Sequence, residues 1–286
     1  MSHKTISLVL GSGGARGLAH VGVIRWLEEH GHEIKSISGC SIGSLIGGAH
    51  ATGKLDTVVE WMESFTKKEI YSMLDLSFTW NSLVKGDKMM AAIQSKIGTD
   101  LIEDLPIKFT AVAADIAAEK EHWFQSGPID QAIRASVSLP LFFTPHNQGG
   151  VQLIDGGILN PTPIEPTLGD NTDLCIAVDL GGPLMQETAL ESEEARSPWQ
   201  QKMDDFLDSM KFSESAPKDQ WDMFYIADQS FNTMQNAIAR GRMADNPPDH
   251  LIAVPRNKCG TLEFDRSAEM IEYGYRLAAE QLSGKL

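Results

Sequence analysis

A strand, a glycine-rich loop and a helix follow one another directly in VLGSGGARGLAHVGVIRWLEEHG, residues Val9–Gly31. The pattern predicts a buried strand over Lys4–Leu10 and a helix over Gly17–His30. Backbone N–H groups and the positive end of the helix dipole face the loop between them, so the loop is suited to hold a negative charge.

Two nucleotide-binding interpretations of this loop fail. A P-loop requires a lysine followed by serine or threonine after its second glycine, and the loop has none. A dinucleotide-binding loop counted from Gly11 has Arg16 where the last glycine should stand. The second strand also ends in IKSISG, without the acidic residue that would hold a ribose.

The second predicted strand, Glu33–Ser38, runs into GCSIG, Gly39–Gly43, and a helix is predicted over 41–52. A G-x-S-x-G sequence between a strand and a helix is the context of a nucleophile elbow, with Ser41 as the nucleophile. The alternative is a glycine- and serine-rich helix start that serves only close packing.

If Ser41 attacks a carbonyl, the negative charge that the glycine-rich loop holds is the oxyanion of the transition state. The N–H groups of Gly13 and Gly14 are placed to stabilise that charge, and Ile42 offers a third. The alternative for this loop is a tight turn that packs the first helix on the sheet.

An acid follows a further apolar strand, Val151–Ile154, in VQLIDGGILNPTP. Asp155 stands at the carboxyl end of that strand, where α/β sheets place their sites, and Gly156 and Gly157 allow close approach of backbone. The alternative role for Asp155 is to cap a turn. Of the eight histidines, only His250 follows both Ser41 and Asp155, the order of a Ser-Asp-His triad, and it is predicted to begin a strand.

Strands and helices alternate along the chain, which predicts an α/β sheet with helices on both faces. His20, on the first helix beside the glycine loop, is expected to pack there. The other predicted elements are strands at 107–115, 119–125, 174–178 and 250–254, and helices at 55–65, 87–97, 128–137, 221–240 and from 265 onward.

Composition limits the class of protein. The 286 residues carry a net charge of −15 and are 42% hydrophobic, so nucleic acid is an unfavourable partner. Three widely spaced cysteines form no disulfide or zinc pattern, and no segment fits a signal peptide or a membrane span. We expect one domain over 1–286 with its motif-bearing core at 4–180, an acidic insertion at 182–222, partly helical or mobile, and a C-terminal part at 223–286 that packs on the core.

Three motifs in fixed order, GSGGARG, GCSIG and DGG, closely resemble those of the patatin-like phospholipase family. The segments FTAVAADI and FQSGPIDQAIRASVSLPLFFTP extend the resemblance, which covers roughly Lys4–Leu180. The tail FDRSAEMIEYGYRLA is similar to that of the bacterial branch of the family, which also resembles the catalytic domain of neuropathy target esterase. Ser12 and Cys40 depart from the residues frequent at their positions, glycine and threonine.

The resemblance implies a three-layer α/β/α sandwich with a mostly parallel central sheet, similar to the catalytic domain of cytosolic phospholipase A2. It implies that Ser41 is the nucleophile and Asp155 the general base of a dyad without histidine. This dyad is expected to work without a metal or cofactor. The oxyanion-hole residues are then Gly13, Gly14, Arg16 and Ile42, and the motif glycines are Gly11, Gly17, Gly39, Gly43, Gly156 and Gly157.

The predicted activity is hydrolysis of fatty-acyl esters of phospholipids, lysophospholipids or related lipids. An acyltransferase or thioesterase using the same serine, and a non-catalytic regulatory protein on the same fold, are the alternatives. The partner is a lipid or ester substrate, with transient contact at a membrane surface and a cytoplasmic location. The aromatic stretch Tyr71–Trp80 is either a lipid-facing cap or ordinary core.

Overall fold

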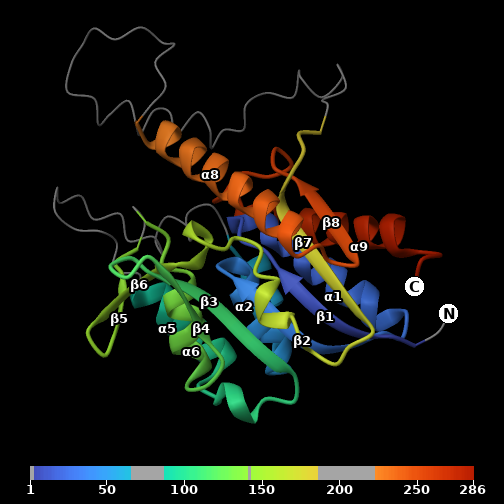
Figure 1. Ribbon diagram of the computed structural model, residues 1–286, viewed down its shortest axis with the longest axis horizontal. Coiled ribbons are helices and arrows are strands. Elements are labelled where there is room, and N and C mark those ends of the chain that lie inside the picture. Colours follow the sequence, from blue (N-terminus) through green and yellow to red (C-terminus); the bar gives the residue numbers. More distant parts are fainter. Residues whose placement is uncertain (1–2, 66–86, 141–142, 186–222) are drawn as a thin grey trace, which may run out of the picture.

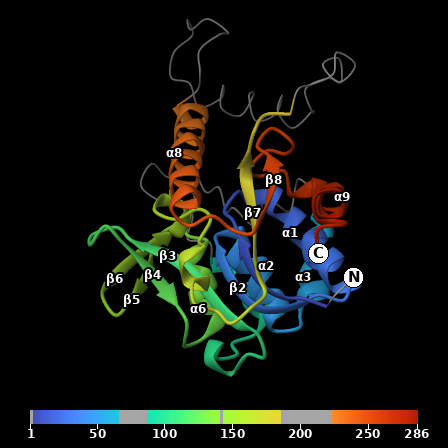
Figure 2. The same ribbon diagram turned by 45° about the vertical axis from the view of Figure 1, so that its right-hand side comes forward.

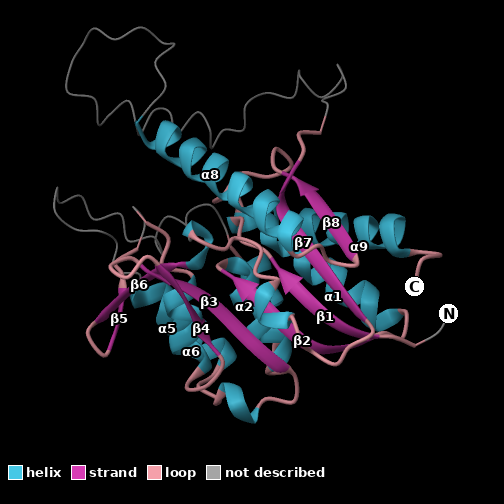
Figure 3. Ribbon diagram, viewed as in Figure 1, coloured by secondary structure: helices cyan, strands magenta, loops and turns pink. Residues whose placement is uncertain are grey.

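A computed structural model describes residues 3–65, 87–140, 143–185 and 223–286 (Figure 1). Its strands form one eight-stranded sheet in the order β5-β6-β3-β2-β1-β7-β8, with β4 paired to β3. The strands, magenta in Figure 3, are β1 (Thr5–Leu10), β2 (Glu33–Cys40), β3 (Lys108–Asp115), β4 (Lys120–Phe124), β5 (His146–Gln148), β6 (Val151–Asp155), β7 (Leu174–Gly182) and β8 (His250–Pro255).

Five neighbouring strands, β3, β2, β1, β7 and β8, run parallel, whereas β4, β5 and β6 are antiparallel additions. Parallel neighbours require crossover connections, and helices supply most of them. The helices are α1 (Ala19–Glu29), α2 (Ile42–Ala51), α3 (Leu55–Glu63), α5 (Asp87–Ile97), α6 (Ile129–Ser136), α8 (Met223–Asp245) and α9 (Ser267–Leu282).

The two faces of the sheet bury apolar side chains in separate clusters. On β1, Leu8 and its alternate neighbours join the large core formed with α1, α2 and α9, while Val9 points to the opposite face and meets Ile164 and, on α8, Met243. Figure 2 shows α8 on one side of β7 and α1, α3 and α9 on the other. The molecule is therefore the expected three-layer sandwich with a mostly parallel sheet.

The structure departs from the predicted elements at a few places. The first helix is preceded by a 3-10 turn over Gly14–Leu18, and β2 and β7 extend to Cys40 and Gly182. Strand β5 was not predicted. It forms a hairpin with β6 through Gly149 and Gly150, whose φ angles of 59° and 94° suit a two-residue turn. The stretch Tyr71–Trp80 and most of 182–222 lie outside the described residues.

Candidate active site

Strands β2 and β6 end against the same part of β3. β2 runs parallel to β3 and ends with Cys40 opposite Val112, whereas β6 runs antiparallel and ends with Asp155 opposite Ala113. Both lie on the side of β3 away from β4, because β4 pairs with 111–115 from the other side. The carboxyl ends of β2 and β6 therefore meet head to head, and this meeting brings Asp155 beside the turn that contains Ser41.

Ser41 occupies a sharp turn between β2 and α2. Its φ of 55° and ψ of −123° are unusual for a residue with a side chain, and such strain is common where a side chain must be presented for chemistry. The flanking glycines permit the turn: a Cβ on Gly39 would stand 2.5 Å from the Gly43 carbonyl oxygen, and one on Gly43 would stand 2.0 Å from the Leu10 carbonyl oxygen. The local geometry is that of a nucleophile elbow.

A segment at the end of α6 contacts both candidate residues. The Ser41 N–H donates to Ser136 Oγ at 2.9 Å, and that buried hydroxyl donates in turn to the Val112 carbonyl oxygen at 2.7 Å. Two residues later, the Ser138 carbonyl accepts from the Asp155 N–H at 2.9 Å. In the sequence, Ser136 lies in a segment that shows only a resemblance to the family, and nothing local indicates that its hydroxyl binds the turn at Ser41.

Asp155 is completely buried, and its two carboxylate oxygens differ in their partners. Oδ1 accepts from the Gly157 N–H at 2.8 Å and from the Cys40 thiol at 3.8 Å. Oδ2 has no hydrogen-bond partner among the described residues. Asp155 thus has one oxygen fixed by the loop that follows it and one left for a proton.

Burial raises the pKa of Asp155 to about 6, although the nearby Ser41 hydroxyl and the hydrogen bonds from Gly157 and Cys40 act in the opposite direction. The Ser41 hydroxyl is near enough to lower this pKa, but no hydrogen bond of ordinary geometry joins these two described residues. Such contacts often tighten only when substrate is bound. A carboxyl group with this pKa is mostly ionised at neutral pH and is a stronger base than an exposed aspartate.

The glycine loop presents free backbone donors. Its neighbouring N–H groups are used: Gly11 donates to Val178, Ser12 to Pro161 and Ala15 to Thr261. The N–H groups of Gly13, Gly14 and Ile42 have no acceptor among the described residues. Unpaired N–H groups at helix starts are the usual means of binding an anion.

Arg16 anchors this loop. Its guanidinium is buried and donates to the carbonyl oxygens of Leu180 at 3.1 Å and Cys259 at 2.9 Å, and to Asn232 Oδ1 at 3.4 Å. Burial lowers the pKa of Arg16 from its ordinary value, and acidic neighbours partly oppose that effect. These hydrogen bonds tie the loop to β7, to the Cys259 turn and to α8, so the side chain serves to fix the loop.

Two loop glycines are required by close packing. A Cβ on Gly14 would stand 2.3 Å from the Thr261 carbonyl oxygen, and one on Gly17 would stand 2.4 Å from Ile42 Cγ1. A valine at position 14 would therefore collide with the Thr261 turn, and its φ of 59° adds backbone strain. Close packing against the Thr261 turn is therefore a reason for glycine at position 14 in addition to its N–H donor.

Neither candidate histidine is placed to act on Ser41 as a general base. His20 is completely buried with Nε2 2.9 Å from the Gly11 carbonyl oxygen, and burial lowers its pKa to about 4. His250 begins β8 as predicted and pairs with Ile176 near the start of β7. Since β8 and β2 belong to the same parallel set, His250 lies at the opposite edge of the sheet from Ser41.

The described residues contain no cluster of three or more His, Cys, Asp or Glu side chains able to hold a metal ion. Among the same residues, no helix combines the length and apolar character required to cross a bilayer. Two shallow hollows on the surface are lined by described residues other than Ser41 and Asp155. The candidate site is therefore identified by the meeting of the carboxyl ends of β2 and β6.

Comparison with known proteins identifies the family of the chain. The sequence profile described as patatin-like phospholipase matches residues 8–168. An uncharacterized NTE family protein of Mycobacterium tuberculosis is 35% identical over 331 aligned positions, which cover 98% of this chain and 92% of that protein. Lysophospholipase NTE1 of Pyricularia oryzae is 28% identical over 98% of this chain, which corresponds to 18% of the fungal protein.

Among solved structures, VipD from Legionella pneumophila has a TM-score of 0.47 and 16% sequence identity, with 98% of this chain and 66% of that chain covered. The profile match alone spans more than half of the 286 residues. The chain therefore belongs to the patatin-like phospholipase family of lipid hydrolases.

Proposed function

We propose that this protein hydrolyses fatty-acyl esters of phospholipids, lysophospholipids or related lipids through a Ser41–Asp155 dyad. The observation that carries the proposal is the head-to-head meeting of β2 and β6, which sets a serine in a strained turn beside a fully buried carboxylate. The names of the family and of the fungal relative support the choice of lipid ester as substrate.

Acylation begins when Ser41 Oγ attacks the ester carbonyl carbon and its proton passes to Asp155. The carbonyl oxygen becomes an oxyanion that accepts hydrogen bonds from the unpaired N–H groups of Gly13, Gly14 and Ile42. When the tetrahedral intermediate collapses, the ester bond breaks and Asp155 returns the proton to the leaving alcohol. The fatty acyl group remains as an ester of Ser41.

Deacylation repeats these steps with water. Asp155 takes a proton from the attacking water, the same N–H groups stabilise the second oxyanion, and the proton goes to Ser41 Oγ as the fatty acid leaves. Loss of one oxyanion donor typically lowers turnover by about 10²- to 10³-fold, so the glycine loop carries a large part of the rate.

A lipid substrate would bring the protein to the surface of a membrane. Long-chain phospholipids reside in membranes, so we propose that the protein makes transient contact with a membrane surface while it works. The net charge of −15 gives no general attraction to anionic lipid, so this contact depends on local apolar side chains.

Paired variants test the proposal. Ser41→Ala and Asp155→Asn should each lower ester hydrolysis by about 10³-fold or more, while Ser95→Ala, an exposed serine on α5, should not. A fluorophosphonate probe should label the wild-type protein and Ser95→Ala but not Ser41→Ala. Hydrolysis that survives in Ser41→Ala would overturn the proposal, as would a wild-type protein that neither labels nor hydrolyses.

Product analysis in the presence of a thiol or alcohol acceptor completes this test. Free fatty acid as the main product supports hydrolysis. Acyl transfer to the acceptor in preference to water would show that the dyad serves a transferase, and it would replace the proposed activity.

A further inference from the structure

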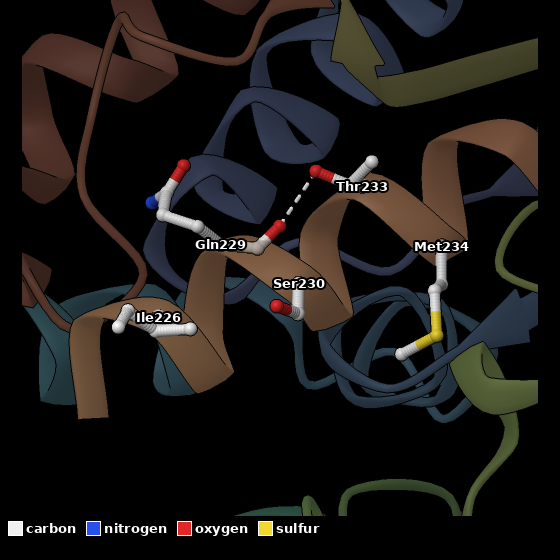
Figure 4. A pocket seen from close by; sticks show the side chains of 5 residues that line it. All are labelled: Ile226, Gln229, Ser230, Thr233 and Met234. Carbon is white, nitrogen blue, oxygen red and sulfur yellow. Dashed lines mark hydrogen bonds between the residues drawn. The ribbon is translucent and has the colours of Figure 1, made fainter. Parts of the chain in front are cut away.

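Helix α8 has two faces of different character. One face is exposed and lines a shallow hollow with Ile226, Gln229, Ser230, Thr233 and Met234, which Figure 4 shows. The other face turns toward the sheet and carries mostly polar residues, at positions 228, 232, 235, 239 and 242. Among the described residues of that inner face, Ala239 is buried, and the partly buried Met243 packs against Val9 and Ile164.

The inner face crosses both loops of the active site. Asn232 accepts a hydrogen bond from Arg16 of the glycine loop. Farther along the helix, Arg242 forms ion pairs with Glu121 at 2.6 Å and Glu165 at 2.8 Å, and it donates to the Leu159 carbonyl oxygen in the segment that follows Asp155. These contacts fix α8 across the site with Gln235 between them.

Gln235 is 6% exposed, and its amide extends toward Gly157 in the loop that follows Asp155. The point where a Cβ of Gly157 would stand is 2.0 Å from Gln235 Nε2, 2.9 Å from Ser12 Oγ and 3.0 Å from Asp155 Oδ1. The amide of Gln235 thus lies beside the carboxylate. A Cβ at position 157 would displace that amide from its present place.

The amide of Gln235 has spare hydrogen-bonding capacity. A glutamine side chain offers two N–H donors and a carbonyl acceptor. Its one hydrogen bond among the described residues is long, 3.4 Å from Nε2 to Ser12 Oγ. Its second N–H and its carbonyl oxygen have no hydrogen bond among the described residues, so they remain available to a group that enters the site.

We propose that Gln235 donates a hydrogen bond to a hydroxyl or other oxygen of the leaving alcohol, and thereby favours esters of polyols, such as glycerol-based lipids, over esters of simple alcohols. The proposal rests on the function proposed above. Asp155 must return the proton to the leaving alcohol, so that alcohol lies on the Asp155 side of the site, where the amide of Gln235 also lies. Since the amide lies between the Asp155 carboxylate and Ser12 of the glycine loop, a hydroxyl of the leaving alcohol that extends from Asp155 toward this loop would meet it.

Two esters that differ only in the hydroxyl groups of their alcohol test this role. The substrates are 1-octanoylglycerol and propyl octanoate, which share the acyl chain and a three-carbon alcohol. Gln235→Met keeps the size and helix propensity of the side chain but removes the donor. Gln229→Met makes the same exchange on the exposed face of α8 and is the matched control.

Loss of one hydrogen bond to a neutral oxygen should lower kcat/KM for 1-octanoylglycerol by about 3- to 10-fold. The value for propyl octanoate should change by less than about twofold, and Gln229→Met should change neither. If Gln235→Met folds poorly, Gln235→Asn retracts the amide by one methylene and should give the same selective loss. An equal loss on both esters, or no loss on either, would overturn the proposal.

The result is separable from a failure of the proposed function. If Ser41→Ala retains hydrolysis of both esters, the dyad is wrong whatever Gln235 does. If Ser41→Ala is inactive while Gln235→Met shows no selectivity between the esters, the dyad stands and the role of Gln235 is overturned.

Discussion

The most informative single change is Asp155→Asn, because the structure predicts opposite effects on activity and on stability. The carboxyl group is fully buried and its pKa is raised from 3.8 to about 6. A raised pKa means that the folded state disfavours the ionised form, so the wild-type protein loses stability as pH rises above 3.8 and the loss is complete once pH exceeds about 6. Asparagine keeps an oxygen for the Gly157 N–H and carries no charge.

The size of the effect follows from the shift. One pKa unit corresponds to about 1.4 kcal/mol, so burial of the ionised group costs the wild-type protein about 3 kcal/mol at about pH 8 and about half of that at about pH 5. Asp155→Asn should therefore be more stable than wild type at the higher pH, and at the lower pH its advantage should be smaller by about half of this cost. Burial of the amide offsets part of the gain at both values.

Thermal and urea unfolding of both proteins at the two pH values measure this difference. Groups other than Asp155 titrate equally in the two proteins, so they cancel in the comparison. A gain of 1 kcal/mol raises the melting temperature of a large domain by about 2–4 °C. An Asp155→Asn protein that is no more stable at about pH 8, or whose advantage does not change with pH, would refute the assignment of a buried, ionised base.

Two further predictions concern the base and the elbow. The pH profile of kcat/KM should rise with a midpoint near 6, the pKa of Asp155, and His250→Ala should retain both the midpoint and most of the activity; loss of both in that variant would favour a triad. Ser136→Ala should lower kcat by about 10-fold or more with a smaller change in KM, because the Ser41 N–H and the Val112 carbonyl both lose their partner. Fluorophosphonate labelling should slow in parallel. Unchanged kcat and labelling would show that the turn at Ser41 does not need this hydroxyl.

The midpoint of the pH profile cannot by itself separate dyad from triad. An unperturbed aspartate titrates near 3.9 and a histidine near 6.5, so residue type alone would assign a dyad an acidic midpoint. Burial moves Asp155 to about 6, close to the histidine value. The distinction therefore depends on the histidine variants, and it illustrates why residue identity alone does not fix a titration.

The strand ends that form the site were predictable because their signals are local. The two glycines and the serine within Gly39–Gly43 predict the turn, and Asp155 directly follows an apolar strand. The head-to-head meeting of β2 and β6 was not predictable in the same way. It depends on β6 pairing antiparallel with the end of β3, a contact between distant segments that no local pattern encodes.

The contribution of α8 was hidden for a related reason. Its inner face is polar, and in a sequence a polar helix face indicates solvent. Asn232 and Gln235 face loops more than 200 residues earlier in the chain, so their burial appears only in the folded molecule. Ser136 was missed because a serine near the end of a helix is ordinary in composition, and its hydrogen bond to the elbow spans 95 residues.

A buried aspartate can replace histidine as a general base only if the fold raises its basicity and still leaves it ionised. A shift from 3.8 to about 6 makes the carboxylate about 100-fold more basic, and at neutral pH roughly nine-tenths of it stays ionised. A much larger shift would leave it protonated and inactive. The Gly157 N–H and the Cys40 thiol limit the shift by stabilising the charge, and Gly156 lets the loop close over the strand end, since a Cβ there would stand 2.3 Å from the Val112 carbonyl oxygen. Enclosure and hydrogen bonding are thus balanced at Asp155, and in the proposed mechanism the N–H groups of the glycine loop lower the remaining barrier.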